Sequence, residues 1–583
     1  MTPEHLLCPD SMISNRIMIV KIFFNMLREY QIRKILFYFL TFRLQFFRNK
    51  GIRAHKNEEE MLRVNNLKLP LNADIKQIKK QVAQECCLKE TDLQNFKISK
   101  RSIDARNKNN VHFVYSVDFS SKVIPQNHKN IEEILPAEPL NFKIKKSAVR
   151  PIVVGSGPAG MFAALALAEA GLCPIILERG ADVDTRRQEI ETFWKIGKLN
   201  PETNVQFGEG GAGTFSDGKL MSGIKKDKFT AKVFNEFVAA GAPQEILYFA
   251  KPHVGTDNLR KVVKNIRKKI ISLGGEYRFN HKLEDLIIEN ELLKSVLIKH
   301  GNETYELPTK WLFLALGHSA RDTFEMLERR GLHLEQKPFS VGIRIEHKQA
   351  LINEAQYGKA ANNPYLGAAD YKLAVHLPNG RSVYTFCMCP GGQVVAAASE
   401  IGRVVTNGMS EFARNKENAN SALLVGVSGC DFGSDQPLAG MYFQRKLEEL
   451  AFIAGGRNYQ APAQTVGDFL AARKSKKFAD VMPSYLPQVT PSNLATILPT
   501  EICDSLRMAI LQMNNKLCGF SCPSAIMTGV ETRSSSPIRI VRDAAYQSNI
   551  KGIFPCGEGA GYAGGITSAA ADGLKAVYSL NIE

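Results

Sequence analysis

Glycines gather in the sequence at a point where they can bind a nucleotide. Gly155, Gly157 and Gly160 form a G-x-G-x-x-G motif between a short apolar segment, Ile152–Val154, and an alanine-rich segment typical of a helix. A second apolar strand follows and ends at Glu178. In the order strand, turn, helix, strand and acid, the motif predicts a dinucleotide site. The pyrophosphate would lie at the helix N-terminus, where free N–H groups and the helix dipole attract negative charge.

Each residue type in this motif has a physical task. Gly155 permits the tight turn, Gly157 lets the backbone approach the pyrophosphate, and Gly160 allows close helix–strand packing. The carboxylate of Glu178 is expected to accept a hydrogen bond from a ribose hydroxyl and to disfavour a 2′-phosphate. The dinucleotide contacts predicted here are Gly155, Ser156, Gly157, Pro158, Ala159, Gly160, Glu178 and Arg179.

A second glycine-rich segment, near the C-terminus, favours FAD over NAD. An apolar strand ends at Gly557-Glu558 and is followed by glycines and a small-residue helix from about Ile566. This segment resembles the C-terminal FAD motif of the glutathione-reductase-type flavoproteins. The resemblance implies that Glu558 binds a ribityl hydroxyl and that the helix N-terminus faces the pyrimidine edge of the flavin. The segment 310–317 resembles a further strand of that superfamily, with Leu316 in place of the usual Thr. The FAD contacts predicted from these segments are Gly317, Gly557, Glu558, Gly565 and Ile566.

A third glycine-rich stretch, residues 204–220, has four glycines between Gly208 and Gly213. Such a density requires a close backbone approach or positive φ angles. We expect this loop to pass over the FAD, with Ser216, Asp217 and Lys219 near the isoalloxazine ring; a surface turn is the alternative. The FAD contacts predicted in the loop are Gly210, Gly211, Gly213 and Thr214.

Together with further motifs, this loop resembles a widespread FAD-dependent dehydrogenase family of microbial origin. The other segments that carry the resemblance are 387–400, 406–410, 418–427, 529–540 and 556–573. The similarity extends from Met61 to Glu583. It implies FAD binding, oxidoreductase chemistry and a small domain before the nucleotide fold. It implies no particular substrate.

The pattern along the chain predicts an α/β fold class: a Rossmann-type FAD-binding domain with an inserted β-rich substrate domain and a small N-terminal α+β domain. A β-α-β-β pattern follows Met61, helices and strands alternate over 229–330, and strands dominate beyond residue 331. The expected domains are 61–148 for the α+β domain, 149–330 with 541–583 for the FAD-binding domain, and 331–540 for the substrate domain.

Four residues are candidates for catalysis. Cys387 and Cys389 form a C-x-C on an expected strand, whose alternation would place both thiols on one face. They are either structural or face the flavin or substrate; a disulfide between them is geometrically awkward, and a metal site needs more ligands. Arg344 can bind a carboxylate through two hydrogen bonds or form an ion pair on a sheet surface. Arg533 belongs to a polar cluster suited to substrate or flavin contacts. We expect His318 to cap the backbone, and we expect no metal ion.

Composition excludes several classes of protein. With 44% hydrophobic and 23% charged residues, the 583-residue chain is neither disordered nor fibrous. It has no run of 18 apolar residues, so no transmembrane helix is predicted. The eleven scattered cysteines favour a reducing compartment, and we expect a cytoplasmic protein.

The first sixty residues differ from the rest. The net charge is +17, and ten Lys and Arg stand against one acid, Glu29, between Ser11 and Lys56. We expect residues 1–60 to be a basic extension outside the native fold. A helix on a membrane surface and a targeting segment are the alternatives.

The predicted function is FAD-dependent hydride transfer between a small organic substrate and flavin, with reoxidation by an external acceptor. Because no second dinucleotide motif is present, an NAD(P)H-dependent reductase would have to bind NAD(P)H transiently on the flavin; this is the first alternative. A flavin-binding RNA-modification protein and a membrane-bound quinone reductase based on residues 16–50 are the others. We expect no nucleic-acid partner and no integral membrane contact, and nothing in the sequence sets an oligomeric state.

Overall fold

The computed structural model divides the chain into two compact units, residues 1–60 and 61–583. The residues described are 61–123, 125, 130–134, 138–145, 147–220 and 227–581. The basic extension expected from the sequence therefore lies outside the described residues. Within the described residues, no helix combines the length and the apolar character needed to cross a membrane.

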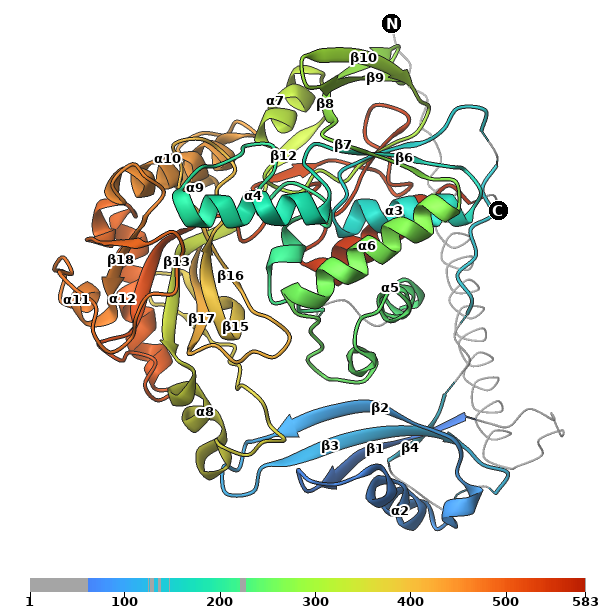
Figure 1. Ribbon diagram of the computed structural model, residues 1–583, viewed down its shortest axis with the longest axis vertical. Helices are drawn as coiled ribbons and strands as arrows, with labels where there is room; N and C mark the ends of the chain where they lie inside the picture. Colours follow the sequence, from blue (N-terminus) through green and yellow to red (C-terminus); the bar gives the residue numbers. More distant parts are fainter. Residues whose placement is uncertain are drawn as a thin grey trace, which may run out of the picture. The chain divides into compact units, whose positions relative to one another are not determined.

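A four-stranded antiparallel sheet and one helix begin the second unit (Figure 1). Its elements are β1 (Met61–Leu69), α2 (Ile75–Cys86), β2 (Gln94–Asp104), β3 (His112–Ser120) and β4 (Ile131–Glu133), and the strand order is β2-β3-β1-β4. Helix α2 begins at Ile75 because the Asp74 carboxylate accepts a 2.8 Å hydrogen bond from the Gln77 backbone N–H, and the Gln77 side-chain oxygen accepts one from the Asp74 backbone N–H. The β-α-β-β order is confirmed.

A five-stranded parallel sheet follows, with strand order β22-β11-β5-β6-β7. Its strands are β5 (Ile152–Val154), β6 (Ile175–Glu178), β7 (Glu276–Phe279), β11 (Leu312–Leu314) and β22 (Ile553–Pro555). Strand β22 comes from the C-terminal end of the chain and pairs with β11, so the two distant FAD motifs share one sheet. The two chain ends thus build one Rossmann-type fold, and the predicted fold class is confirmed.

Helix α3 occupies the centre of this part of the molecule. It spans Pro158–Glu169, and ten of its twelve residues are buried. Its alanines and leucines are apolar all round because α3 packs against the sheet, α6 (Thr256–Ser272) and α13 (Ile566–Tyr578). Figure 1 shows α3 and α6 side by side. The other elements of this part are α4 (Val183–Ile196), α5 (Lys228–Ala239), β8 (Lys282–Glu289), β9 (Leu292–His300), β10 (Glu303–Pro308) and α7 (Arg321–Arg329).

The inserted part of the chain contains an eight-stranded sheet that is almost wholly antiparallel. Its strand order is β14-β15-β17-β13-β20-β18-β19, with β16 paired to β15. The strands are β13 (Phe339–Lys348), β14 (Ala374–His376), β15 (Ser382–Ala396), β16 (Thr406–Met409), β17 (Asn418–Val427), β18 (Ala461–Thr465), β19 (Val489–Pro491) and β20 (Ile526–Glu531).

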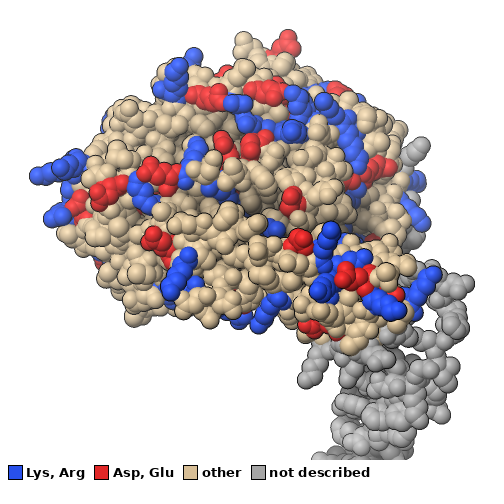
Figure 2. Space-filling view, turned by 60° about the horizontal axis from the view of Figure 1, so that its bottom comes forward, with Lys and Arg blue, Asp and Glu red and all other residues tan. Residues whose placement is uncertain are grey.

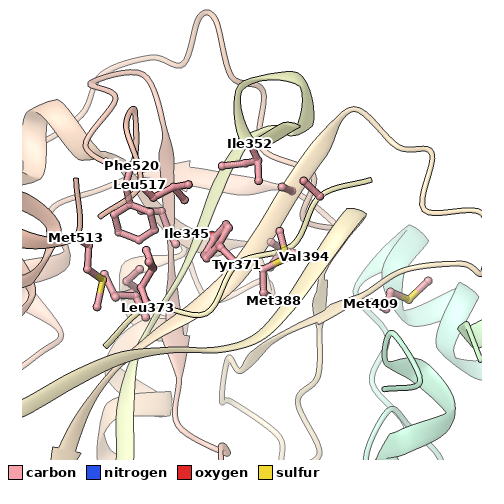
Figure 3. Packing of buried hydrophobic residues seen from close by; sticks show 14 of the residues in the cluster. Ile345, Ile352, Tyr371, Leu373, Met388, Val394, Met409, Met513, Leu517 and Phe520 are labelled. Carbon is pink, nitrogen blue, oxygen red and sulfur yellow. The ribbon is translucent and has the colours of Figure 1, made fainter. Parts of the chain in front are cut away.

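Helices cover this sheet. The sequence analysis predicted strands in this part of the chain but not these helices. They are α8 (Gln349–Tyr357), α9 (Gly429–Phe432), α10 (Ala439–Ala454), α11 (Val466–Leu470) and α12 (Thr500–Asn514). Figure 3 shows Met513 of α12 and Phe520 beside Ile345 of β13 and Leu373, the residue before β14. The helices form because their apolar faces cover the sheet, a tertiary effect that strand-like segments alone do not reveal.

Two short strands and an ionic cluster connect the inserted sheet to the parallel sheet. Strands β12 (Leu334–Gln336) and β21 (Ile538–Ile540) pair antiparallel where the chain leaves and returns. In the cluster, Glu448 of α10 accepts hydrogen bonds from Arg321 at 2.7 Å and from Arg533 at 2.9 Å. Although burial opposes ionisation, the two guanidinium groups hold the pKa of Glu448 well below its usual range. The division into domains at the predicted boundaries stays a prediction.

Removing the charge at the centre of this cluster should destabilise the fold. We expect Glu448→Gln to lower the free energy of unfolding by about 3–5 kcal/mol, because two buried guanidinium groups lose their counter-charge. The urea midpoint of unfolding measures the effect. Glu449→Gln, on the exposed neighbouring position, is the matched control and should leave the midpoint unchanged. Equal midpoints for both variants would show that the cluster does not hold the two parts together.

Candidate functional site

A cavity of about 310 Å³ lies at the carboxyl ends of the parallel strands. Segments after β5, β6, β11 and β22 form one side, and β15, β16 and the end of β20 form the other. Ligands of open α/β sheets bind at this edge. The predicted cofactor contacts that line the cavity are Gly155, Gly157, Pro158, Ala159, Glu178, Arg179, Gly211, Gly213, Gly317, Glu558, Gly565 and Ile566. Those that do not line it are Ser156, Gly160, Gly210, Thr214 and Gly557.

The carboxylate of Glu178 joins two of the loops that form the wall. Its Oε2 accepts hydrogen bonds from the backbone N–H of Ser156 at 2.9 Å and from the Ser156 hydroxyl at 2.7 Å. Its Oε1 accepts from the N–H groups of Gly180 and Gly208, both at 2.9 Å. Glu178 therefore fixes the fingerprint turn against the glycine-rich loop. Its contact with a ribose hydroxyl stays a prediction.

The glycine-rich loop is anchored from beneath by Arg186, a fully buried residue of α4 that the sequence analysis did not identify. Its guanidinium donates hydrogen bonds to the backbone carbonyls of Asn204, Val205, Gly208, Glu209 and Gly211. Burial lowers the pKa of Arg186 to about 10. The alternative of a surface turn is wrong for this loop, because its backbone is bound to a buried cation.

The glycines of the wall fall into two groups. Gly155 has φ = +95°, and a Cβ there would overlap the Ala315 carbonyl oxygen, so the turn itself requires glycine. Gly157 differs, because a Cβ there would meet only the Gly211 Cα, at 3.7 Å. Around Gly317 and Gly565 a Cβ would meet nothing within 4 Å. These three glycines leave open space along the cavity that an extended dinucleotide can fill.

Glu558 and His318 lie together on the cavity wall. The Glu558 carboxylate is 3.8 Å from the His318 Nε2. Burial raises the pKa of Glu558 to about 7 and lowers that of His318 to about 3, so the imidazole is neutral near pH 7. Among the described residues, the buried Nδ1 of His318 has no hydrogen-bond partner. The His318 side chain thus lines the cavity, whereas the sequence analysis expected it to cap the backbone.

Asp217 and Lys219 lie at the far end of the glycine-rich loop, where they line the cavity together with Ser216. Their position near the isoalloxazine ring stays a prediction. The Lys219 ammonium is 3.1 Å from the Asp217 carboxylate and also donates to the Met388 carbonyl. Arg414 and Ser410 donate further hydrogen bonds to Asp217. Burial would raise the pKa of Asp217, but these cations outweigh it and hold the value at about 2. The site therefore contains a permanent carboxylate balanced by two cations.

Cys387 lines the cavity next to this cluster, whereas Cys389 is fully buried behind it. The prediction that both thiols lie on one face assumed regular strand alternation, and β15 is irregular between the two cysteines. The pairing of β15 with β17 shifts between Phe386 and Cys389, and Cys387 has φ = +43°. This irregularity of the β-bulge type re-aims the side chains.

Arg344 does not line the cavity, and the expected alternatives of a substrate ligand or a surface ion pair are both wrong for it. Its fully buried guanidinium donates to Glu531 and Asn420, each at 2.9 Å. A third hydrogen bond, of 2.5 Å, goes to the Cys387 carbonyl. Arg344 is thus a structural cation that supports Glu531 and Cys387, two cavity residues.

Arg533 does line the cavity, but its guanidinium is engaged in hydrogen bonds with other side chains. It donates to Glu448, to the Ser319 hydroxyl at 3.0 Å and to the Ser399 hydroxyl at 2.6 Å. Arg533 therefore contributes positive charge to the wall with few donors left for a substrate. Within the described ranges, no cluster of three or more His, Cys, Asp or Glu residues has the arrangement of a metal site.

Known proteins are similar to this chain along almost all of the second unit. Residues 338–534 match the family described as FAD-dependent protein, C-terminal domain-like, and residues 150–188 match an FAD binding domain. Residues 61–120 match a domain of unknown function. An uncharacterized protein of Clostridium beijerinckii is 49% identical over 523 residues, which cover 88% of this chain and 97% of that protein.

The fold, the cavity and these matches define an FAD-dependent oxidoreductase. The chain belongs to the family of FAD-dependent proteins that includes the Clostridium protein. The predicted family and the predicted FAD cofactor are confirmed.

Solved structures show only distant similarity. A glycerol-3-phosphate dehydrogenase from Bacillus halodurans, complexed with FAD, is 11% identical with a TM-score of 0.34, over 74% of this chain and 64% of that one. A 3-ketosteroid-Δ4-(5α)-dehydrogenase from Rhodococcus jostii is 11% identical with a TM-score of 0.33, over 76% and 98% of the two chains. At these values neither structure informs on the substrate.

The open space at Gly157 gives a test of cofactor placement. Gly157→Ala suits the local backbone, which has φ = −70° and ψ = −178°, but its methyl group projects into the cavity. We expect FAD binding to weaken at least about tenfold, or about 1.4 kcal/mol, while the FAD-free protein keeps its stability to within about 1 kcal/mol. Flavin fluorescence titration measures the affinity. Gly426→Ala, whose Cβ would meet only the Ser382 carbonyl at 3.9 Å, is the control. Equal affinities would place the cofactor elsewhere.

The raised pKa of Glu558 predicts a pH-dependent stability. An unfolded Glu titrates near pH 4.3, so between that value and about 7 the folded state retains a proton that the unfolded state has released. The free energy of unfolding therefore falls as pH rises through this window. Thermal midpoints of FAD-free protein at about pH 5 and about pH 8 measure it.

We expect the thermal midpoint of Glu558→Gln, relative to that of wild type, to increase as the pH is raised between these two values. Glu335→Gln removes an exposed carboxylate in β12 and should show no such gain. A pH-independent difference between Glu558→Gln and wild type would contradict the burial of this carboxyl group.

Proposed function

We propose that the protein is an FAD-dependent dehydrogenase that takes a hydride from a small organic substrate bound in this cavity. The observation that carries the proposal is the continuity of the cavity. One wall carries the loops of the FAD-binding fold, and the other carries Phe386, Cys387 and Asn407 of the inserted sheet. A cofactor on the first wall therefore has room for a reacting molecule between its ring and the second.

The predicted contacts divide by position along the cavity. The N-terminus of α3, at Gly157, would bind the pyrophosphate, because the first turn of a helix has free N–H groups and the space at Gly157 is open. The N-terminus of α13, at Gly565 and Ile566, lines the cavity and would stabilise negative charge on a flavin bound there. FAD, when bound, supplies the hydride acceptor. Ser156 and Glu178 position the phosphate turn.

The substrate end of the cavity combines an apolar surface with polar groups. Phe386 offers a partly exposed ring, and Asn407 offers an amide. Lys219 and Asp217 compensate one another, so the net charge that they present is small. This wall suits a small organic molecule with one polar edge. The protein side chains orient that molecule and exclude water during transfer.

The first alternative, an NAD(P)H-dependent reductase, uses the same cavity with a different hydride donor. The RNA-modification alternative requires a basic surface, and the face in Figure 2 shows Lys and Arg interspersed with Asp and Glu. A cytoplasmic location is part of the proposal: all ten described cysteines are free, as a reducing compartment favours.

Anaerobic addition of reductants to the purified yellow protein separates these functions. We expect NADH and NADPH to leave the visible flavin absorbance unchanged on the timescale of turnover, and a panel of small alcohols, amines and hydroxy acids to contain a compound that bleaches it. Rapid bleaching by either pyridine nucleotide would contradict the dehydrogenase and establish the reductase. Electrophoretic shift with single-stranded RNA at low salt, compared before and after deletion of residues 61–120, tests the third function.

A further inference from the structure

Two cysteines meet at the substrate end of the cavity. At Cys387 the pairing of β15 with β17 shifts and φ is +43°, so the regular strand geometry that makes a C-x-C disulfide awkward does not apply here. The Cys389 Sγ lies 3.2 Å from the Cys387 carbonyl oxygen. Cys387 is partly exposed to the cavity and Cys389 is fully buried. The pair therefore has an accessible outer thiol and a protected inner thiol.

The residue between them fixes this arrangement. Met388 is only 4% exposed, and Figure 3 shows its side chain among the core residues Tyr371 and Val394. Its carbonyl accepts the hydrogen bond from Lys219. The tripeptide is thus held on one side by the core and on the other by a cation of the glycine-rich loop.

Charged groups from several elements face the pair. Lys219 and Arg344 are the cations, and the Arg344 Nη2 is 3.7 Å from the Cys389 Sγ. The neighbouring carboxyl groups are Asp217, Glu531 and Glu558. Cys389, with the charges of Lys219 and Arg344, lowers the pKa of the Cys387 thiol below its usual range. Burial raises the pKa of Cys389. These opposite shifts favour one thiolate and one thiol, the combination that disulfide exchange requires.

We propose that Cys387 and Cys389 form a redox-active dithiol that carries electrons from the flavin to a small disulfide entering the cavity. The inference rests on the proposed function, for which it names the class of electron acceptor. It follows from the position of Cys387 in the same cavity as Gly565 and Ile566 of α13.

The dithiol would reduce one disulfide, RSSR, with two electrons and two protons in two exchange steps. The Cys387 thiolate attacks one sulfur of the disulfide RSSR, which forms a mixed disulfide and releases RS⁻. Cys389 loses its proton and attacks the Cys387 sulfur; the Cys387–Cys389 bond forms, and a second RS⁻ leaves. The two thiolates released take up two protons, one of them from Cys389. Bound FAD, once reduced by the organic substrate, would supply two electrons and one proton, which would break the bond and restore one thiolate and one thiol.

Trapping of the mixed disulfide tests the outer and inner roles. The full-length holoenzyme is treated with 2-hydroxyethyl disulfide and analysed by peptide mass spectrometry. We expect wild type to form a Cys387–Cys389 disulfide, and Cys389→Ser to retain one mercaptoethanol group on Cys387. Cys518→Ser removes an exposed cysteine of the other closely spaced pair, Cys518 and Cys522, and should behave as wild type. Absence of both products at Cys387, while exposed Cys518 reacts, would overturn the proposal.

A reductive titration tests the link to flavin without relying on Cys389→Ser. Holoenzyme oxidised with the same disulfide and freed of reagent is titrated anaerobically with dithionite. We expect wild type to take up two electrons per FAD more than Cys387→Ser, because only wild type holds the Cys387–Cys389 disulfide, whereas mixed disulfides on exposed cysteines add equally to both proteins. Equal uptake by the two proteins would overturn the relay while leaving the dehydrogenase intact. A protein without flavin absorbance would instead contradict the proposed function.

Discussion

The carboxylate of Glu178 holds together the parts on which the cofactor site depends. Its four hydrogen bonds join the turn after β5 to the loop that starts near Gly180 and returns at Gly208. A buried carboxylate requires such donors, since unpaired it would be strongly disfavoured. Arg186 complements it by binding five carbonyls of the same loop. Anion and cation thus shape an irregular glycine-rich backbone into a fixed wall.

This wall becomes a reaction site only because the inserted sheet closes it. The cluster of Arg321, Glu448 and Arg533 joins α7, α10 and the end of β20, so that the two faces of the cavity keep their spacing. On the inserted side, Arg344 supports Glu531 and the Cys387 carbonyl. Buried ion pairs thus occur both between the two sheets and within the inserted sheet. They position the cavity more than they add stability, because desolvation offsets much of their attraction.

Local patterns in the sequence predicted a large part of this structure. The fingerprint turn, the β-α-β-β order after Met61 and the alternation of helices and strands over 229–330 all follow from short-range rules of spacing and burial. The line of predicted contacts along the cavity was also accessible, because glycine motifs specify close backbone approach. The family resemblance predicted that the two chain ends form one fold, and the pairing of β22 with β11 agrees with it.

The remaining features depend on contacts distant in sequence. Arg186 lies on an ordinary amphipathic helix, and nothing in its neighbourhood shows that it will be buried beneath a loop. Arg344 was expected either to bind a carboxylate or to form an ion pair on a sheet surface, because strand alternation does not reveal that both faces of β13 are covered. The irregularity at Cys387 likewise arises from pairing with β17.

The central claim is that FAD occupies this cavity, and the absorption spectrum of the purified full-length chain tests it most directly. The account predicts a yellow protein with one FAD per chain, whose FAD is released on denaturation. A colourless protein that fails to take up added FAD would contradict it.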